Sequence, residues 1–236
     1  MGSLVVLCIY TRAKIDKEKY GLEPVYDGRL LIKVLNLSVW SMLHAFISVA
    51  PWFLFFVAIE HLGKTELAIS NITRSVSAIF FVIANSFAVT TGSLVSNAIG
   101  AGAKNLLFPI CHKILKLGYA IGFPLVVVAL LCNRWIVSFY TDNELLIELA
   151  FAPFVVMLLN YTFALPGYVY LNAVGGTGKN KITFLFQVTT TCVYLVYLYW
   201  LSFCIEASLA LYLTAEYLFV ILLALQSIIY LKSKHY

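Results

Sequence analysis

Residues 65–102 read TELAISNITRSVSAIFFVIANSFAVTTGSLVSNAIGAG and contain no proline. Before the closing Gly100-Ala101-Gly102, Gly92 is the single glycine in this stretch. A helix from Glu66 to Ile99 would be roughly 50 Å long at ~1.5 Å per residue, whereas the hydrocarbon core of a bilayer is only about 30 Å thick. The closing glycines are a helix-ending signal. The stretch therefore predicts a helix that crosses a membrane and projects beyond it.

The composition also indicates a membrane protein. Of the 236 residues, 62% are hydrophobic and only 11% are charged, whereas soluble domains carry about 25% charged residues. The net charge of +5 does not indicate a nucleic-acid partner, because the basic residues lie between apolar segments. The five cysteines are widely spaced and show neither a disulfide framework nor metal-ligand spacing. We expect no metal and no cofactor.

The apolar segments predict an all-α bundle of six membrane spans. These spans cover residues 37–62, 66–99, 106–132, 145–174, 182–204 and 207–231. Residues 1–10 are too short to span and resemble the end of a preceding helix, and residues 11–36 form a charged connector. Within the connector, residues 28–36 have the pattern of an amphipathic helix at the membrane interface. The expected domains are therefore residues 1–36, a helix end and cytoplasmic connector, and residues 37–236, a six-helix transmembrane lobe.

Proline and glycine positions add detail to these spans. Pro51 in the first span and Pro166 in the fourth each lack a backbone N–H, which leaves one carbonyl of the preceding turn free near mid-membrane. Gly118 and Gly122 in the third span have GxxxG spacing, which lets a neighbouring helix approach closely.

The basic residues test this topology. When the connections are assigned alternately to two sides of the membrane, one side receives only Lys64 and Arg134. The opposite side receives Arg12, Lys14, Lys17, Lys19, Arg29, Lys33, Lys104, Lys113, Lys116, Lys179, Lys181, Lys232 and Lys234. Positive residues favour the cytoplasmic side. We therefore expect a multi-pass protein of the plasma (inner) membrane with both termini in the cytoplasm.

Two charged residues lie at matched depth inside spans. Arg74 lies ten residues after Lys64, and Glu216 lies ten residues after Glu206. Both helices enter from the same side, so both side chains should lie roughly 15 Å deep. Charges inside a membrane usually face a partner or a wet cavity. An Arg74–Glu216 pair is therefore predicted, either as a lock between two helices or as part of a transport or proton-relay route.

Polar and aromatic side chains suggest a cavity. Polar residues recur at helical spacing along the long helix, at Asn71, Arg74, Ser75, Asn85, Ser86, Ser93 and Asn97. Aromatic residues are dense on the first and fourth spans, where they are suited either to cation–π contacts with amphipathic cations or to ordinary lipid-facing packing. The candidate cavity residues are Trp52, Asn71, Arg74, Asn85, Tyr161, Tyr168 and Glu216.

Catalytic motifs are not predicted. The sequence from Gly175 to Asn180 is not a phosphate loop, because Ala173 stands where the first glycine is required and Asn180 where Ser or Thr must follow the lysine. We interpret it as a turn between helices. An intramembrane prenyl or acyl transferase would need clustered Asp, His or Cys at a membrane face, and no such cluster, HExxH or Ser/His/Asp arrangement stands out.

Three stretches, in this order, resemble the second half of a MATE (multidrug and toxin extrusion) transporter. Residues 96–102 (SNAIGAG) resemble the family's G-Q-x-x-G-A-G helix ending, and residues 138–142 (SFYTD) its L-F-T-x-D segment. Residues 173–178 (AVGGTG) resemble its A-L-R-G-x-G turn. The resemblance covers residues 11–236 and implies the C-terminal of two six-helix lobes around a central cavity. The N-terminal six-helix lobe is then a partner missing from this chain.

The resemblance further implies a cation-coupled antiporter, driven by protons or sodium ions, that exports small cationic or amphipathic organic compounds. Many members carry an acidic residue midway along the first span of this lobe and some an aspartate in the fourth, where this chain has Ser48 and Ala164. The second-lobe cation site of those members is therefore not expected here. Two alternatives stay open: a lipid-linked oligosaccharide flippase of the same superfamily, whose cavity would need basic residues for pyrophosphate, and a non-functional fragment.

Overall fold

The computed structural model describes residues 28–204 and 207–233. The predicted end of a preceding helix and most of the connector, residues 1–27, lie outside the described residues, as do Glu206 and the C-terminal residues 234–236. The chain divides into two units, Met1–Ser38 and Val39–Tyr236, which are described separately.

The described residues fold into helices joined by short turns. In chain order these are α2 (Gly28–Ile59), η1 (Glu60–Leu62), α3 (Lys64–Gly100), η2 (Lys104–Leu106), α4 (Leu107–Leu131), α5 (Asn133–Ser138), α6 (Glu144–Leu149), α7 (Phe151–Leu159), α8 (Tyr161–Gly176), α9 (Asn180–Cys204) and α10 (Leu209–Ser233). Six segments of the described chain are long and apolar enough to cross a membrane. The predicted all-α membrane fold with six spans is therefore confirmed.

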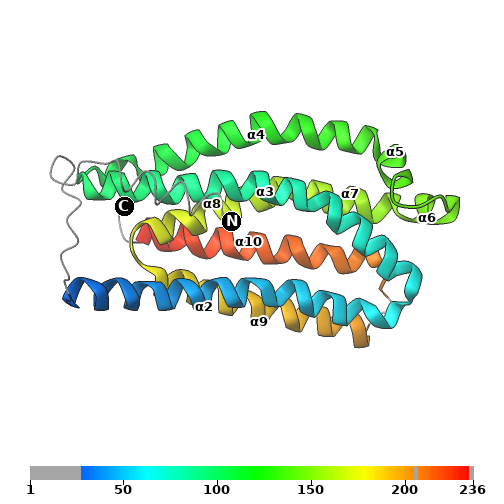
Figure 1. Ribbon diagram of the computed structural model, residues 1–236, viewed down its shortest axis with the longest axis horizontal. Helices are drawn as coiled ribbons and strands as arrows, with labels where there is room; N and C mark the ends of the chain where they lie inside the picture. The colour runs from blue at the N-terminus through cyan, green and yellow to red at the C-terminus, as the bar shows by residue number, and fades with distance from the viewer. Residues whose placement is uncertain (1–27, 205–206, 234–236) are drawn as a thin grey trace, which may run out of the picture. The chain divides into compact units, whose positions relative to one another are not determined.

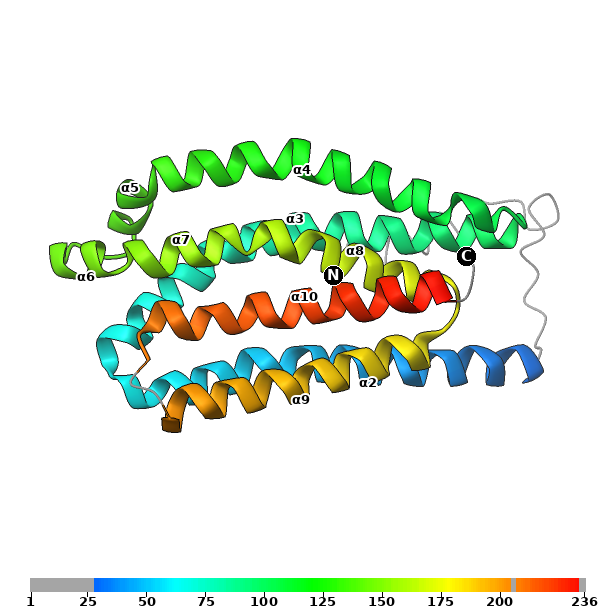
Figure 2. The ribbon, with the colours of Figure 1, turned by 180° about the vertical axis from the view of Figure 1, so that it is seen from behind.

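The second unit is built around α8. This helix packs against α3, α4, α9 and α10, and Figure 1 shows α3, α4 and α10 extending along the same direction. Seen from behind, α5 and α6 lie at the same end of the bundle as the start of α10 (Figure 2). The spans therefore share one long axis, as antiparallel membrane helices with short connections do.

The long helix of the second span is confirmed. α3 has 37 residues and is therefore about 55 Å long. One side of it is buried, with Ile69, Val76, Phe80, Ala84 and Ala88 recurring four or seven residues apart. This spacing gives α3 one face for its neighbours, and the described residues leave its other face uncovered. The helix ends before Gly102, whose φ of +77° is readily adopted by glycine.

The first span begins earlier than expected. α2 is one helix from Gly28 to Ile59, so residues 28–36 are continuous with the span and not a separate interfacial helix. The reason is local: no glycine or proline occurs between Gly28 and Pro51 to end the helix. Pro51 lies inside α2, which continues through it.

The fourth predicted span is divided into α6, α7 and α8, with breaks at Ala150 and Asn160. Pro153 lacks an N–H, so the Leu149 carbonyl loses its helical partner beside the first break. Helical hydrogen bonding still bridges the second break, because the Ala164 amide donates to the Asn160 carbonyl at 2.8 Å. The segment from Glu144 to Gly176 therefore remains one candidate span with two local interruptions.

Small residues allow the central helices to cross closely. A Cβ atom on Gly122 of α4 would overlap the hydroxyl of Tyr161, and one on Gly118 would lie 2.7 Å from Leu165. The Tyr161 hydroxyl donates to the Gly118 carbonyl at 2.8 Å. The GxxxG prediction of a close neighbour is confirmed, and that neighbour is α8.

The carbonyl freed by Pro166 also has a partner. Pro166 lies inside α8 and leaves the carbonyl of Thr162 without its usual amide donor. The hydroxyl of Tyr119, on α4, donates to this oxygen at 2.7 Å. The carbonyl that the proline of the fourth span leaves free thus accepts a hydrogen bond from a tyrosine of the third span.

Candidate functional site

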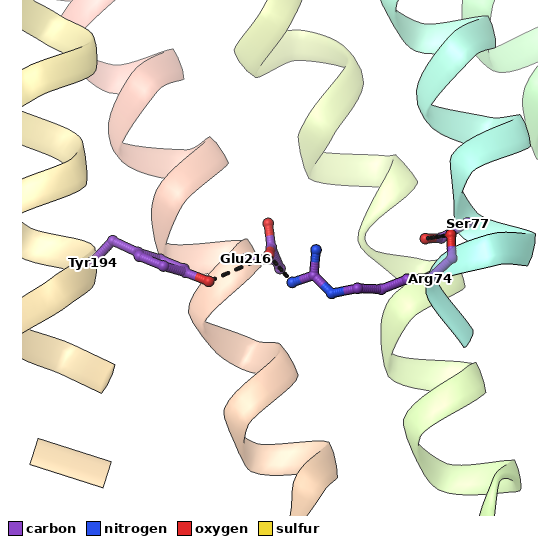
Figure 3. A network of polar contacts seen from close by, with 4 residues as sticks. All are labelled: Arg74, Ser77, Tyr194 and Glu216. Carbon is purple, nitrogen blue, oxygen red and sulfur yellow. Dashed lines mark hydrogen bonds and ion pairs between the residues drawn. The ribbon is translucent and has the colours of Figure 1, made fainter. Parts of the chain in front are cut away.

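Two buried charges meet between α3 and α10. The Nη2 atom of Arg74 lies 2.7 Å from Oε1 of Glu216, and the two side chains are only 4% and 9% exposed. The pairing predicted from matched depth is therefore confirmed. Figure 3 shows Arg74 and Tyr194 approaching Glu216 from opposite sides.

Tyr194 is the third polar member of this group. Its hydroxyl, contributed by α9, donates to the same Glu216 oxygen at 3.4 Å, and the tyrosine is fully buried. Sequence reasoning missed this residue. The segment CVYLVYLYW around it contains several tyrosines, and nothing in their spacing marks the one that faces inward.

Three aromatic rings of α2 surround the guanidinium. The Arg74 Cζ atom lies 4.0 Å from the ring centroid of Phe55, 4.8 Å from that of Trp52 and 5.3 Å from that of Phe56. All three distances are within the ~6 Å range of a cation–π contact. The rings stand at positions i, i+3 and i+4 of a helix, which share one face. We call Trp52, Phe55 and Phe56 the aromatic cage.

The guanidinium is only partly hydrogen-bonded. Among the described residues, its Nε and Nη1 atoms have no hydrogen-bond partner, although both are buried. A guanidinium has five N–H donors, and leaving buried donors unpaired costs about 1–3 kcal/mol each. The positive charge of Arg74 is therefore stabilised by Glu216 and by the faces of the three rings, because most of its N–H groups have no acceptor among the described residues.

A small cavity adjoins the ion pair. Its volume is about 40 Å³, and it is lined by Trp52, Ser77, Phe80, Phe81, Ala84, Met157, Asn160, Tyr161, Ala164, Tyr168 and Glu216. This volume suits a few waters, since each water needs roughly 10–15 Å³ by this measure. The buried Oδ1 atom of Asn160 has no partner among the described residues. The cavity therefore combines aromatic walls with a carboxylate and an unsatisfied amide oxygen.

The structure brings together five of the seven candidate residues. Trp52, Tyr161, Tyr168 and Glu216 line this cavity, and Arg74 pairs with Glu216. Asn71 and Asn85 are exposed and do not line it. Of the polar residues of α3 that the sequence marks at helical spacing, only Arg74 is buried, and the others are exposed: Asn71, Ser75, Asn85, Ser86, Ser93 and Asn97.

A second, larger cavity lies among α2, α3, α8 and α9. Its volume is about 380 Å³, and its polar lining includes His44, Ser93, Asn172 and Asn180. His44 Nε2 is buried without a hydrogen-bond partner among the described residues. Among the described residues, His44 is the one acidic or basic residue that lines this cavity, so this lining lacks the paired charges of the Arg74–Glu216 site.

Comparison with known proteins identifies the family. The family model described as MatE matches residues 41–200, which is more than half of the chain. This chain belongs to the MATE family. The resemblance to this family seen in the SNAIGAG, SFYTD and AVGGTG stretches is therefore confirmed, and the six apolar helices agree with a membrane protein of that family. Among curated proteins, none matches this MATE chain in sequence.

Solved structures share the fold of this MATE chain. One is a crystal structure of MATE in the bent conformation, with 18% identity and a TM-score of 0.75, covering 86% of this chain and 45% of that one. A MATE in complex with MaL6 has 16% identity and a TM-score of 0.77, covering 89% and 48% respectively. A third is a MOP superfamily transporter from Pyrococcus furiosus Vc1 (DSM3638), with 17% identity and a TM-score of 0.69, covering 88% and 46% respectively. The chain thus spans less than half the length of these structures.

Proposed function

We propose that this chain is the C-terminal lobe of a cation-coupled antiporter that exports small cationic or amphipathic organic compounds. The lobe works with an N-terminal six-helix lobe in the plasma (inner) membrane, with both termini in the cytoplasm. The observation that carries this proposal is Glu216: a buried carboxylate, 2.7 Å from its partner arginine, beside a cavity with aromatic walls.

A carboxylate in this setting suits ion coupling. Glu216 holds Arg74 through a single oxygen, so either a proton or a sodium ion at the carboxylate competes directly with the guanidinium. A ligand shifts a conformational equilibrium only through different affinities for the two states. Loading of Glu216 by the coupling ion alters the contact that joins α3 to α10, which couples ion binding to helix position.

The same pair argues against the flippase alternative. Holding a pyrophosphate requires basic side chains with charge to spare. Among the described residues, Arg74 is the buried basic side chain, and Glu216 already neutralises it. The aromatic cage likewise favours a cationic ligand, because ring faces attract positive charge and not phosphate.

The test uses proteoliposomes that contain the complete two-lobed transporter. An imposed proton or sodium gradient should drive export of an amphipathic cation such as ethidium, and one of the two gradients should suffice. Reconstituted residues 1–236 alone should give no flux, since alternating access requires two units that move around a shared site. Failure of both gradients to move cations, or gradient-independent movement of a lipid-linked pyrophosphate sugar, would overturn the proposal.

A further inference from the structure

The guanidinium of Arg74 is surrounded as a bound ligand would be. It lies over the Phe55, Trp52 and Phe56 rings at 4.0, 4.8 and 5.3 Å and contacts one Glu216 oxygen at 2.7 Å. Aromatic rings with a carboxylate form the usual recognition chemistry for organic cations, including quaternary ammonium groups. In this chain the occupant is a side chain of the protein itself.

The geometry differs from that of a lock between helices. A locking arginine typically uses its planar fork to bind a carboxylate with two parallel hydrogen bonds. Arg74 makes one, through Nη2, and its Nε and Nη1 atoms have no hydrogen-bond partner among the described residues. Ring faces recognise charge without the directional demands of hydrogen bonds. The site therefore selects for a positive charge and not for the hydrogen-bond pattern of arginine.

We infer that the aromatic cage and Glu216 form a binding site for organic cations in which Arg74 is a tethered occupant, and that a substrate cation enters by displacing Arg74. The inference rests on the proposed function for its role in transport and names the substrate class of that site: compounds bearing a guanidinium or quaternary ammonium group. Displacement is required because the site supplies one carboxylate, and two adjacent cations would repel each other.

Displacement also explains how binding and coupling share one carboxylate. With Arg74 in place the pair is neutral, and the buried Glu216 is never left without a partner. When a substrate cation takes the cage, Arg74 is released. When a coupling ion takes the carboxylate, the substrate loses its counter-charge. Competition for a single carboxylate is therefore sufficient for exchange of substrate against ion.

The tether makes a strong quantitative prediction. A group attached at its site acts at an effective concentration of about millimolar or more, so free cations should compete poorly with Arg74 in the unaltered chain. Arg74→Ala removes the occupant and leaves the cage and Glu216 in place. The variant should therefore bind a free cation at concentrations at least about tenfold lower than the parent chain does.

The experiment measures cation binding to the purified chain in detergent. Methylguanidinium and tetramethylammonium, at matched ionic strength against sodium, are titrated while the thermal unfolding midpoint and tryptophan fluorescence are followed. Arg74→Ala should show a saturable rise in midpoint, and Arg74→Ala/Glu216→Gln should lose it. Arg134→Ala, which opens the exposed pair with Glu144, is the matched control and should respond as the parent does. If Arg74→Ala fails to fold, Arg74→Gln keeps the side-chain length without the charge.

A flat response in the folded Arg74 variants, or an equal response in the Glu216→Gln double variant, overturns the inference. The measurement uses neither a gradient nor the partner lobe, so its failure is distinguishable from failure of the proposed function. Saturable binding without cation export in the complete transporter would refute the proposed function alone. Export without saturable binding would refute the cage alone.

Discussion

Two ion pairs in this chain have the same chemistry and nearly the same length. Arg74 and Glu216 are 2.7 Å apart with side chains 4% and 9% exposed, whereas Arg134 and Glu144 are 2.8 Å apart with side chains 78% and 77% exposed. Exposed pairs typically contribute 0–1 kcal/mol. Removing one partner of a buried pair costs about 3–5 kcal/mol, because the remaining charge is stranded. The expected contributions of the two pairs to stability therefore differ because of burial and not because of the distance between the charged atoms.

The pairs also join different parts of the chain. Arg134 and Glu144 are ten residues apart and link α5 to α6, so a short turn already brings them near. Arg74 and Glu216 are 142 residues apart and link α3 to α10. A stranded charge in any wrong arrangement is costly, so the buried pair favours the arrangement in which these two helices meet.

The largest expected effect is on the buried pair. Arg74→Ala and Glu216→Ala should each lower the free energy of unfolding by about 3–5 kcal/mol, because each strands the other charge. The double variant should lose less than the two single losses combined. Unfolding in detergent measures all three variants against the parent chain. Strictly additive losses would contradict a direct interaction.

Burial should decide the effect of a glycine substitution as it does that of a charge. A Cβ on Gly176 would lie 2.5 Å from the Gly92 carbonyl, whereas one on Gly100 would meet nothing within 4 Å. Gly176→Ala should therefore cost about 1–3 kcal/mol through overpacking where α8 crosses α3. Gly100→Ala is the matched control, and its midpoint should not fall. Equal midpoints for the two variants would show that α3 and α8 are less closely packed than described.

A neutral, partly buried contact should have an intermediate effect. Tyr119→Phe removes the hydroxyl that donates to the Thr162 carbonyl and should cost about 1 kcal/mol. In a Pro166→Ala background the restored amide can serve that carbonyl, so the same substitution should cost less. A double-variant cycle on unfolding free energies checks this. A loss of equal size in both backgrounds would mean that the tyrosine acts by packing alone.

The smallest effect is expected at the exposed pair. Arg134→Ala and Glu144→Ala should each change stability by less than about 1 kcal/mol, and the change should shrink as salt is added, since exposed charges are screened. Unfolding midpoints at low and high salt measure this. A loss as large as that at Arg74 would break the comparison between the two pairs.

The spans were predictable because they depend on local signals. Apolar segment length, glycine turns and the proline-free run of α3 fixed the number of spans, and matched depth predicted the Arg74–Glu216 pair. The break at Asn160 was not predictable, because no proline stands at the position that would remove its hydrogen bond. The early start of α2 is hard to predict, because the charged residues in its first turns, Arg29 and Lys33, continue the composition of the connector before it.

The surroundings of the pair were harder to predict. Trp52 was expected in a cavity, and its companions Phe55 and Phe56 have the spacing of one helix face, yet spacing alone does not say which neighbour that face meets. Tyr194 had no distinguishing signal at all. Asn71 and Asn85 were grouped with Arg74 because all are polar on one long helix, but only Arg74 is buried. Whether each of these side chains faces the ion pair depends on packing between helices that are far apart in the sequence, and no local pattern encodes that packing.

If the Arg74–Glu216 pair couples ion binding to transport, as proposed above, the exposed Arg134–Glu144 pair should be dispensable for transport. The direct measurement is export of an amphipathic cation by the complete transporter, with each variant compared at equal amounts of protein in the membrane. We expect Glu216→Gln to abolish gradient-driven export and Glu144→Gln to leave it unchanged. Full export by folded Glu216→Gln transporter would contradict the account and would reduce the Arg74–Glu216 pair to a contact between two helices.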